Sequence, residues 1–251
     1  MFPGRVSRRT LAFFTLLLLM VGPRAFAGEL CERLVFEGAP FTVCTVDLRQ
    51  HDMRLVWQDD DGRPYASFRN LPRELNGQTI RLGMNAGMFN ANLAPIGLYI
   101  ENGEEYQRLI TTDGPGNFHL KPNGVFHLTE GRAAVTESEA FRQQEVTPDY
   151  ATQSGPMLVI DGELHPGLLP ESLSLKRRNG VGVRDPHTVV LAITEQPVNF
   201  HTFARLFRDE LACDNALFLD GSMSSLFLPE TGRLDALRPM GPMLLVLDEA
   251  Y

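Results

Sequence analysis

Residues 97–109 read GLYIENGEEYQRL, and this stretch decides how the rest of the chain is interpreted. Two short runs of residues, Gly97 to Glu101 and Glu104 to Leu109, flank the dipeptide Asn102-Gly103. Asn-Gly fits the two central positions of a tight hairpin turn, because both positions require positive φ angles. The stretch therefore predicts a β-hairpin, in which two neighbouring strands pair antiparallel.

The same arrangement recurs along the chain. Strand-forming runs flank Glu130-Gly131, Asp161-Gly162 and the four residues from Arg184 to His187. Each connection is short and contains a turn-forming residue, so each predicts a further hairpin. The regular alternation of strand and helix that builds parallel sheets does not occur in this sequence.

Only one helix is clear from the sequence. Asn199 is a good N-cap, and five apolar residues after it fall on one helical face: Phe200, Phe203, Ala204, Phe207 and Leu211. A second, weaker helix is expected from about Ser138 to Gln144. The sequence therefore predicts an α+β fold, a strand-rich single domain with a mixed or antiparallel sheet and a few helices.

The first 27 residues have the composition of a targeting segment. Arg5, Arg8 and Arg9 precede an apolar run from Leu11 to Gly22, and Ala25-Phe26-Ala27 follows. This order predicts a secretory signal peptide over residues 1–27, cleaved after about Ala27, and one domain over residues 28–251. The apolar run is short for a bilayer span, although an uncleaved membrane anchor is the alternative interpretation. We expect a periplasmic or secreted protein with no stable membrane insertion after cleavage.

The overall composition narrows the class of protein. The 251 residues are 43% hydrophobic and 22% charged, which is typical of a globular chain and excludes a disordered one. The formal net charge is −8, and removal of the signal peptide leaves 19 basic and 31 acidic residues. Because nucleic-acid binders are normally basic, we expect no nucleic-acid partner.

The three cysteines have different expected fates. Cys31 and Cys44 flank a segment that is expected to form two extended arms around a turn. In an oxidising compartment this favours a disulfide between Cys31 and Cys44. Cys213 is then left over, and its apolar neighbours indicate a buried, inert thiol, since nothing nearby would lower its pKa.

Five polar, glycine-containing segments follow or precede expected strands. They are GMNAGMFN (83–90), GNFHLKPNG (116–124), QSGP (153–156), KRRNGVG (176–182) and LFLDGSMSS (217–225). Glycine lets the backbone approach a ligand, and amide, hydroxyl and cationic side chains can then bind it. Each segment taken alone is also compatible with an ordinary turn, and Lys176 and Arg177 with a solvated charged surface.

Asp220 is the most informative of these residues. It ends an apolar strand and is followed by Gly221 and three serines. A carboxylate at a strand end, beside exposed backbone N–H groups, suits a nucleophile, a base or a metal ligand. An Asx turn that closes the strand is the alternative.

The order of the segments resembles a known family. Asn85-Ala-Gly-Met-Phe, Lys121-Pro-Asn-Gly-Val-Phe, Gln153-Ser-Gly-Pro-Met-Leu, Arg178-Asn-Gly-Val-Gly and Leu219-Asp-Gly-Ser-Met-Ser are similar to motifs of the phosphodiester glycosidase domain family. That family includes N-acetylglucosamine-1-phosphodiester α-N-acetylglucosaminidase and an exported bacterial branch. The likeness extends from about Phe36 to Leu247. Met88 and Met223 replace smaller or different residues of relatives, which bears on substrate choice.

The resemblance implies a hydrolase that cleaves the sugar–phosphate bond of glycosyl-1-phosphodiesters of N-acetylglucosamine or a related sugar. Asp220 and Arg178 are the implied catalytic residues, with Arg178 and Lys121 holding the phosphate. The implied substrate-binding residues are Asn85, Gly87, Asn90, Lys121, Asn123, Ser154, Gly155, Asn179, Gly221, Ser222 and Ser224. A phosphate monoester leaves readily, so strong acid assistance is less necessary, in agreement with one prominent carboxylate. The expected partner is a phosphoglycan or sugar-phosphate substrate.

Two other functions remain open at this stage. One is a non-catalytic exported protein that binds glycans or phosphoglycans. The other is a metal-dependent phosphodiesterase with Asp113, Asp214 and Asp220 as ligands, although their spacing does not favour it. No cofactor is required by the sequence, and a divalent Ca or Mg ion is compatible with it.

Overall fold

The computed structural model describes Met1, residues 30–236 and residues 238–248. Apart from Met1, the expected signal peptide and its cleavage site lie outside these residues. Within the described part of the chain, no helix is both long and apolar enough to span a bilayer. The expectation of an exported domain beginning at residue 28 therefore stays a prediction.

Three antiparallel sheets make up the domain. The seven-stranded sheet has the order β1 (Cys31–Phe36), β2 (Ala39–Asp47), β14 (Thr188–Thr194), β13 (Asn179–Asp185), β15 (Asn215–Asp220), β11 (Met157–Ile160) and β12 (Glu163–Leu164). The five-stranded sheet has the order β7 (Glu104–Gln107), β6 (Tyr99–Glu101), β10 (Tyr150–Ser154), β8 (Gly124–Thr129) and β9 (Arg132–Glu137). The six-stranded sheet has the order β17 (Arg233–Leu234), β16 (Leu226–Leu228), β5 (Gln78–Asn85), β18 (Met243–Asp248) and β3 (His51–Val56), with β4 (Glu74–Leu75) paired to β5.

The expected hairpins form. Asn102 and Gly103 have φ angles of 52° and 78° and join β6 to β7, which confirms the turn predicted from Asn-Gly. Glu130-Gly131 joins β8 to β9, and Asp161-Gly162 joins β11 to β12. Every strand pairing in the described residues is antiparallel, so the sheets are antiparallel rather than mixed.

The helices are few and short. Helix α1 (Ser138–Gln143) and helix α2 (Phe200–Arg205) have six residues each, and the Asn199 side chain caps α2 by accepting from the Thr202 N–H at 2.8 Å. The remaining helical pieces are single turns: η1 (Phe68–Asn70), η2 (Asn117–His119), η3 (Leu206–Glu210) and η4 (Pro229–Thr231). The domain is therefore mostly β, which corrects the predicted α+β class. The apolar stripe after Asn199 packs against one face of the seven-stranded sheet. The second half of the predicted helix is a π turn, η3.

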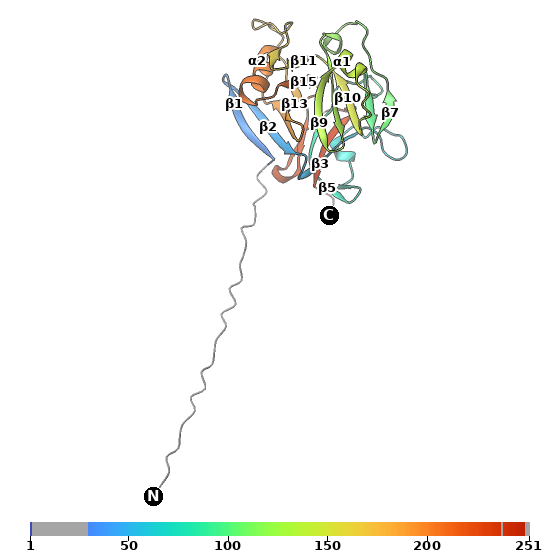
Figure 1. Cartoon of the computed structure of the whole chain (residues 1–251), viewed down its shortest axis with the longest axis vertical. Helices are drawn as coiled ribbons and strands as arrows, with labels where there is room; N and C mark the ends of the chain where they lie inside the picture. Colours follow the sequence, from blue (N-terminus) through green and yellow to red (C-terminus); the bar gives the residue numbers. More distant parts are fainter. Residues whose placement is uncertain (2–29, 237, 249–251) are drawn as a thin grey trace.

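Two apolar layers explain the sequence of β15. Leu217 and Leu219 point into the core shared by the three sheets, while Ala216 and Phe218 point to the opposite face. Helix α2 covers that face, and in Figure 1 it lies with the seven-stranded sheet on one side of the domain. Because β15 is buried on both faces, it reads as a continuous apolar run that delivers Asp220 to its end.

The cysteines are placed as predicted. Cys31 and Cys44 are directly opposite each other on β1 and β2 and form a disulfide. Cys213 is buried, and burial raises the pKa of its thiol to about 12. The prediction of an unreactive Cys213 is consistent with that raised pKa, because the thiolate is the nucleophilic form.

Candidate active site

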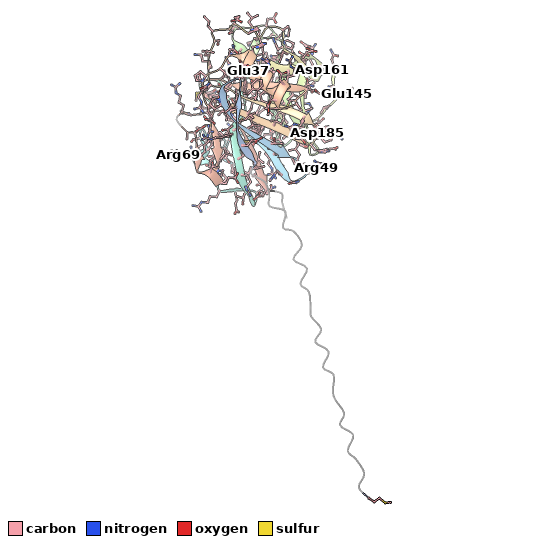
Figure 2. The ribbon with its side chains drawn as sticks, turned by 90° about the vertical axis from the view of Figure 1, so that its left-hand side faces the viewer. Glu37, Arg49, Arg69, Glu145, Asp161 and Asp185 are labelled. Atoms are coloured by element: carbon pink, nitrogen blue, oxygen red, sulfur yellow. A yellow bond between two sulfur atoms is a disulfide. The ribbon has the colours of Figure 1, made fainter. Side chains whose placement is uncertain are left out.

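The three sheets meet where four of the expected site residues lie. Asn85 ends β5, Ser154 ends β10, Asn179 begins β13 and Asp220 ends β15. These strands belong to the six-, five- and seven-stranded sheets, so the residues come from every sheet of the domain. Asn85, Ser154 and Asn179 are completely buried. Arg69, by contrast, is exposed and lies at the periphery of the domain in Figure 2.

Asn85 and Asn179, which we call the asparagine pair, tie two sheets together. The Asn179 Nδ2 donates to the Asn85 backbone O at 2.8 Å, and the Asn179 Oδ1 accepts from the Asp220 N–H at 3.0 Å. The Asn85 Oδ1 accepts from the Ser225 N–H at 2.8 Å. The pair therefore fixes both ends of the turn from Asp220 to Ser225, and burial makes each of these bonds costly to lose.

Asp220 has an environment suited to proton exchange. Burial raises the pKa of its carboxyl from 3.8 to about 6, and the backbone N–H groups of Gly221 and Met223 oppose the rise. The Ser224 Oγ donates to the Asp220 and Gly221 carbonyl oxygens at 3.0 and 2.8 Å and closes the turn. A carboxyl with a pKa near neutrality can act as a nucleophile or as a base in the same pH range.

Ser154 and Gly155 belong to the third motif. Ser154 links it to the fifth motif, and Gly155 packs it against the second. The Ser154 Oγ donates to the Leu219 backbone O at 3.0 Å, one residue before Asp220. A Cβ atom on Gly155 would lie 2.5 Å from the Phe118 backbone O and 2.8 Å from the Asn123 Cβ. Only glycine fits there, so the close approach of these motifs explains the residue type.

Asn123 has a buried side-chain oxygen that accepts no hydrogen bond from the part of the chain that the structure describes. It is 1% exposed, and its Nδ2 donates to the Phe118 backbone O at 2.9 Å. Its Oδ1 is buried and has no hydrogen-bond partner among the described residues. Such an orphaned acceptor is unusual in a folded protein and is a place where a ligand or a water can bind.

Arg178 is held by the core of the domain. It is 1% exposed, its Nε donates to the Val198 O at 3.0 Å and its Nη2 donates to the Ser174 O at 2.7 Å. The guanidinium carbon lies 3.5 Å from the centre of the Phe200 ring, and burial lowers the pKa of Arg178 to about 10. A phosphate would have to displace these contacts to reach Arg178, so the geometry favours a structural role.

Two further residues named from the sequence have other partners. The Lys121 Nζ donates to the Thr111 O at 2.6 Å and pairs with Asp113 at 2.8 Å. Asn90 is exposed, in a turn where its N–H donates to the Ala94 O at 2.8 Å. Neither contact involves Asp220 or the asparagine pair.

The remaining residues named from the sequence lie close to these groups. A Cβ on Gly87, whose φ is 135°, would lie 3.1 Å from the Thr152 Oγ1, and Thr152 itself donates to the Ala86 O. Gly221, Ser222 and Ser224 belong to the turn after Asp220. Thr152 lies outside the five motifs, and Ser225 lies in the fifth but is not among the implied site residues, because a main-chain contact by a hydroxyl or an N–H leaves no pattern.

The proposed metal ligands do not converge. Asp113 pairs with Lys121, and Asp214 precedes β15 whereas Asp220 ends it, about 20 Å away by strand geometry. Among the described residues, no three carboxylate, histidine or cysteine side chains are grouped as metal ligands. The triad of aspartates considered from the sequence is therefore wrong.

A pocket of about 350 Å³ lies beside the turn after Asp220. Its walls include residues that are not among the implied site residues: Arg177, Met223 and Ser225 from the motifs, and Asp235 and Arg238 from outside them. From the sequence, Arg177 is compatible both with anion binding and with a solvated charged surface, and the structure places it at this pocket.

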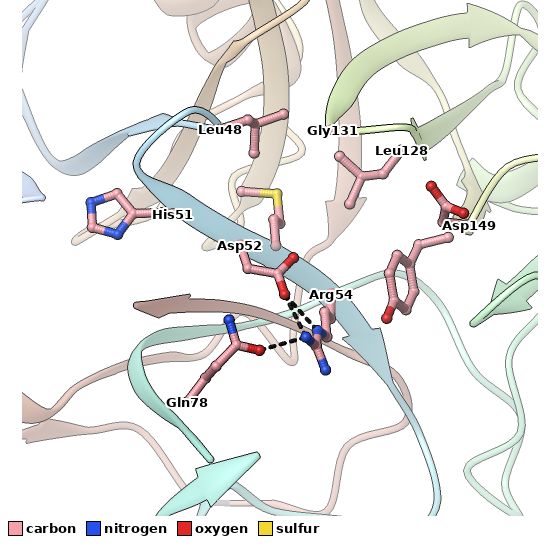
Figure 3. A pocket seen from close by; sticks show the side chains of 10 residues that line it. Leu48, His51, Asp52, Arg54, Gln78, Leu128, Gly131 and Asp149 are labelled. Atoms are coloured by element: carbon pink, nitrogen blue, oxygen red, sulfur yellow. Dashed lines mark hydrogen bonds and ion pairs between the residues drawn. The ribbon is translucent and has the colours of Figure 1, made fainter. Parts of the chain in front are cut away.

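A second pocket lies at the other end of β5. Figure 3 shows Arg54 there, bound by Asp52 at 2.6 Å and by Gln78 at 2.5 Å. Gln78 begins β5 and Asn85 ends it, so this pocket of about 400 Å³ is about 23 Å from the asparagine pair. None of the sequence motifs lines it, and it is distinct from the candidate active site.

Comparison with known proteins points to one family. The family described as "Phosphodiester glycosidase" matches residues 78–247, which include all five motifs. The uncharacterized protein YigE of Escherichia coli strain K12 is 32% identical over 185 residues, covering 73% of this chain and 72% of that protein.

Two solved structures share the fold. The catalytic domain of zebrafish N-acetylglucosamine-1-phosphodiester alpha-N-acetylglucosaminidase, auto-inhibited by its pro-peptide, has a TM-score of 0.56 and 15% identity, covering 88% of this chain and 82% of that one. A putative exported protein from Burkholderia pseudomallei has a TM-score of 0.54 and 12% identity, covering 83% and 74%.

Proposed function

The chain belongs to the phosphodiester glycosidase family, and from this premise we propose that it is an exported hydrolase of glycosyl-1-phosphodiesters. The bond to be cleaved joins the anomeric carbon of the sugar to the phosphate oxygen. The sugar is N-acetylglucosamine or a related one, in keeping with the activity named for the zebrafish relative. The products are the free sugar and a phosphate monoester.

One observation carries the proposal. The asparagine pair, contributed by two different sheets, fixes the turn that begins with Asp220, whose pKa burial raises to about 6. Preorganised hydrogen bonds of this kind hold a reacting group in place without reorganisation during the reaction. A structural turn alone would not need a buried carboxyl whose ionisation opposes folding.

The residues have distinct proposed roles. Asp220 acts on the anomeric carbon, as nucleophile, as base for the attacking water, or by stabilising positive charge on the sugar. The phosphate leaves with the bridging oxygen and carries the negative charge, so one carboxyl suffices. Asn85, Asn179 and Ser154 position the turn.

Export of the protein is part of the proposal. The Cys31–Cys44 disulfide suits an oxidising compartment, and a structural relative is described as a putative exported protein. Together with the expected signal peptide, these observations support a periplasmic or secreted location. Cell fractionation of the full-length chain tests it, and the uncleaved chain in the cytosol would contradict it.

The activity is tested with a panel of sugar-1-phosphodiesters and the purified mature protein. We expect release of free sugar by the wild type and loss of release in Asp220→Asn, which keeps the size and hydrogen-bond acceptor of the side chain. Asp161→Asn, in an exposed turn, serves as the control and should retain activity. If Asp220→Asn is as active as the wild type, Asp220 is not the catalytic group. If the folded wild type binds these compounds without releasing sugar, the protein is a binding module.

A further inference from the structure

Two arginines lie beside the candidate active site. Arg177 and Arg238 line the pocket of about 350 Å³ whose floor is the turn from Ser222 to Ser225. The backbone of Arg177 is close to this turn, since a Cβ on Gly221 would lie 3.6 Å from the Arg177 O. The pocket therefore begins next to the residue that follows Asp220.

The carboxylates near this pocket are already bound by another residue. Arg233 donates from Nη2 to the Asp235 Oδ2 at 2.8 Å and from Nη1 to the Glu195 Oε1 at 2.5 Å. The Glu195 Oε1 also accepts from the Thr42 hydroxyl at 2.5 Å, and the Asp235 Oδ2 from the Leu226 N–H at 3.2 Å. These bonds use much of the acceptor capacity of both carboxylates.

Arg177 is consequently left with weak partners. Its Nη2 lies 3.9 Å from both the Glu195 and the Asp235 carboxylates, beyond hydrogen-bond distance, and its Nε is 3.4 Å from the Thr194 O. The side chain is 37% exposed. Four arginines and three carboxylates line the two pockets that contain Arg177, an excess of one positive charge in a chain whose net charge is −8.

We propose that Arg177, with Arg238, is the anion-binding element of this protein and holds the phosphate of its substrate. The planar guanidinium presents several donors in the geometry that phosphate oxygens accept, and Ser222 lines the same pocket. This inference rests on the proposed function for its substrate, and it moves the phosphate contact from Arg178 to Arg177.

The continuation of the pocket defines what is attached to the phosphate. Arg177 and Asp235 also line a larger pocket, of about 520 Å³, so the two pockets adjoin, and we call them together the groove. Most of the residues that line this larger pocket have polar or charged side chains, among them Glu32, Arg33 and Thr231. An alkyl chain placed there would leave charged groups without water, which is costly. The groove therefore fits a hydroxyl-rich group, a polyol or a sugar, on the far side of the phosphate.

Binding is measured with glycerol phosphate and octyl phosphate, by calorimetry, on the wild-type protein, Arg177→Gln and Arg63→Gln. Arg63 is an exposed arginine paired with Asp61 and serves as the matched control. We expect glycerol phosphate to bind the wild type and the control equally, and Arg177→Gln to bind it about tenfold more weakly. Octyl phosphate should bind no more tightly than glycerol phosphate.

The outcomes separate this inference from the proposed function. Equal binding by Arg177→Gln and the wild type, tighter binding of octyl phosphate, or no binding of either probe at millimolar concentration overturns the inference. Turnover of a sugar phosphodiester is measured on the same preparations. Turnover with an unchanged KM in Arg177→Gln leaves the glycosidase standing and rejects the anion site. Selective binding of glycerol phosphate without turnover supports the anion site and rejects the glycosidase activity.

Discussion

Replacing Asp220 with asparagine should stabilise the fold at neutral pH while it removes activity. The carboxyl has a pKa of about 6 in the folded protein and an ordinary value of 3.8, because burial disfavours its charged form. A raised pKa means that the folded state binds the proton more tightly than the unfolded state. The stability linked to this group is thus fully present below about pH 4 and is lost as the pH rises through 6.

The expected size follows from the pKa difference. A difference of about two units corresponds to about 3 kcal/mol of unfolding free energy at pH 7 and above. Asparagine has nearly the same shape, carries no charge to desolvate, and keeps an oxygen that can accept from the Gly221 N–H. Asp220→Asn should therefore approach this gain at neutral pH and show little or none near pH 4.

The assay is urea unfolding of the wild type and Asp220→Asn at several pH values from 4 to 8. The difference in unfolding free energy should grow through this range and level off above about pH 7. Exposed Asp161→Asn, the control, should show no such trend. A difference that is independent of pH, or a less stable Asp220→Asn at pH 7, would refute the reasoning about a destabilising buried carboxylate.

Four other substitutions test the structure around the site. Asn179→Ala should lower the unfolding free energy by about 3–5 kcal/mol, because it leaves several buried groups without partners, and a loss below about 1 kcal/mol in urea unfolding would contradict this. Arg178→Gln should cost about 2 kcal/mol of stability but leave the KM of the remaining activity unchanged, and a raised KM in steady-state kinetics would return the phosphate contact to Arg178. Gly155→Ala should destabilise by about 1–3 kcal/mol and reduce turnover, because its Cβ would collide with the Phe118 backbone, and normal thermal unfolding would show that the contact is not tight. Joint replacement of Cys31 and Cys44 by serine should cost about 3 kcal/mol, as expected for a sequence separation of 13, and unchanged thermal unfolding would remove the disulfide from the account.

The hairpins could be predicted because their information is local. Asn102-Gly103 needs only its own φ angles to specify the turn between β6 and β7, and the disulfide partners lie on two strands joined by the short Glu37-Gly38 turn. The division into three sheets could not be predicted, because β5 pairs with β16 and β18, which are more than 130 residues away in the chain. The helical content was overestimated because an apolar stripe at helical spacing specifies one buried face and not the length of the helix.

The sequence motifs pointed to several residues that the structure brings together, but not to the contacts that each one makes. The motifs led to Asn85, Asn179 and Asp220 because amides and carboxylates beside glycine are visible in the sequence. The neighbouring Arg177 and Arg178 could not be told apart, since only the packing of Phe200 and the distant Glu195 decide which guanidinium is buried and which is accessible. A single sequence does not predict the environment of a side chain when segments far away in the chain form that environment.

The most direct test of the account is to follow the oxygen of labelled water during hydrolysis of a sugar-1-phosphodiester. Cleavage of the bond between the anomeric carbon and oxygen places the labelled oxygen in the released sugar, and the phosphate monoester remains unlabelled. We predict this result for the wild type and no release for Asp220→Asn. Labelled oxygen in the phosphate would show that the P–O bond is cut, and it would contradict a glycosidase reaction centred on Asp220.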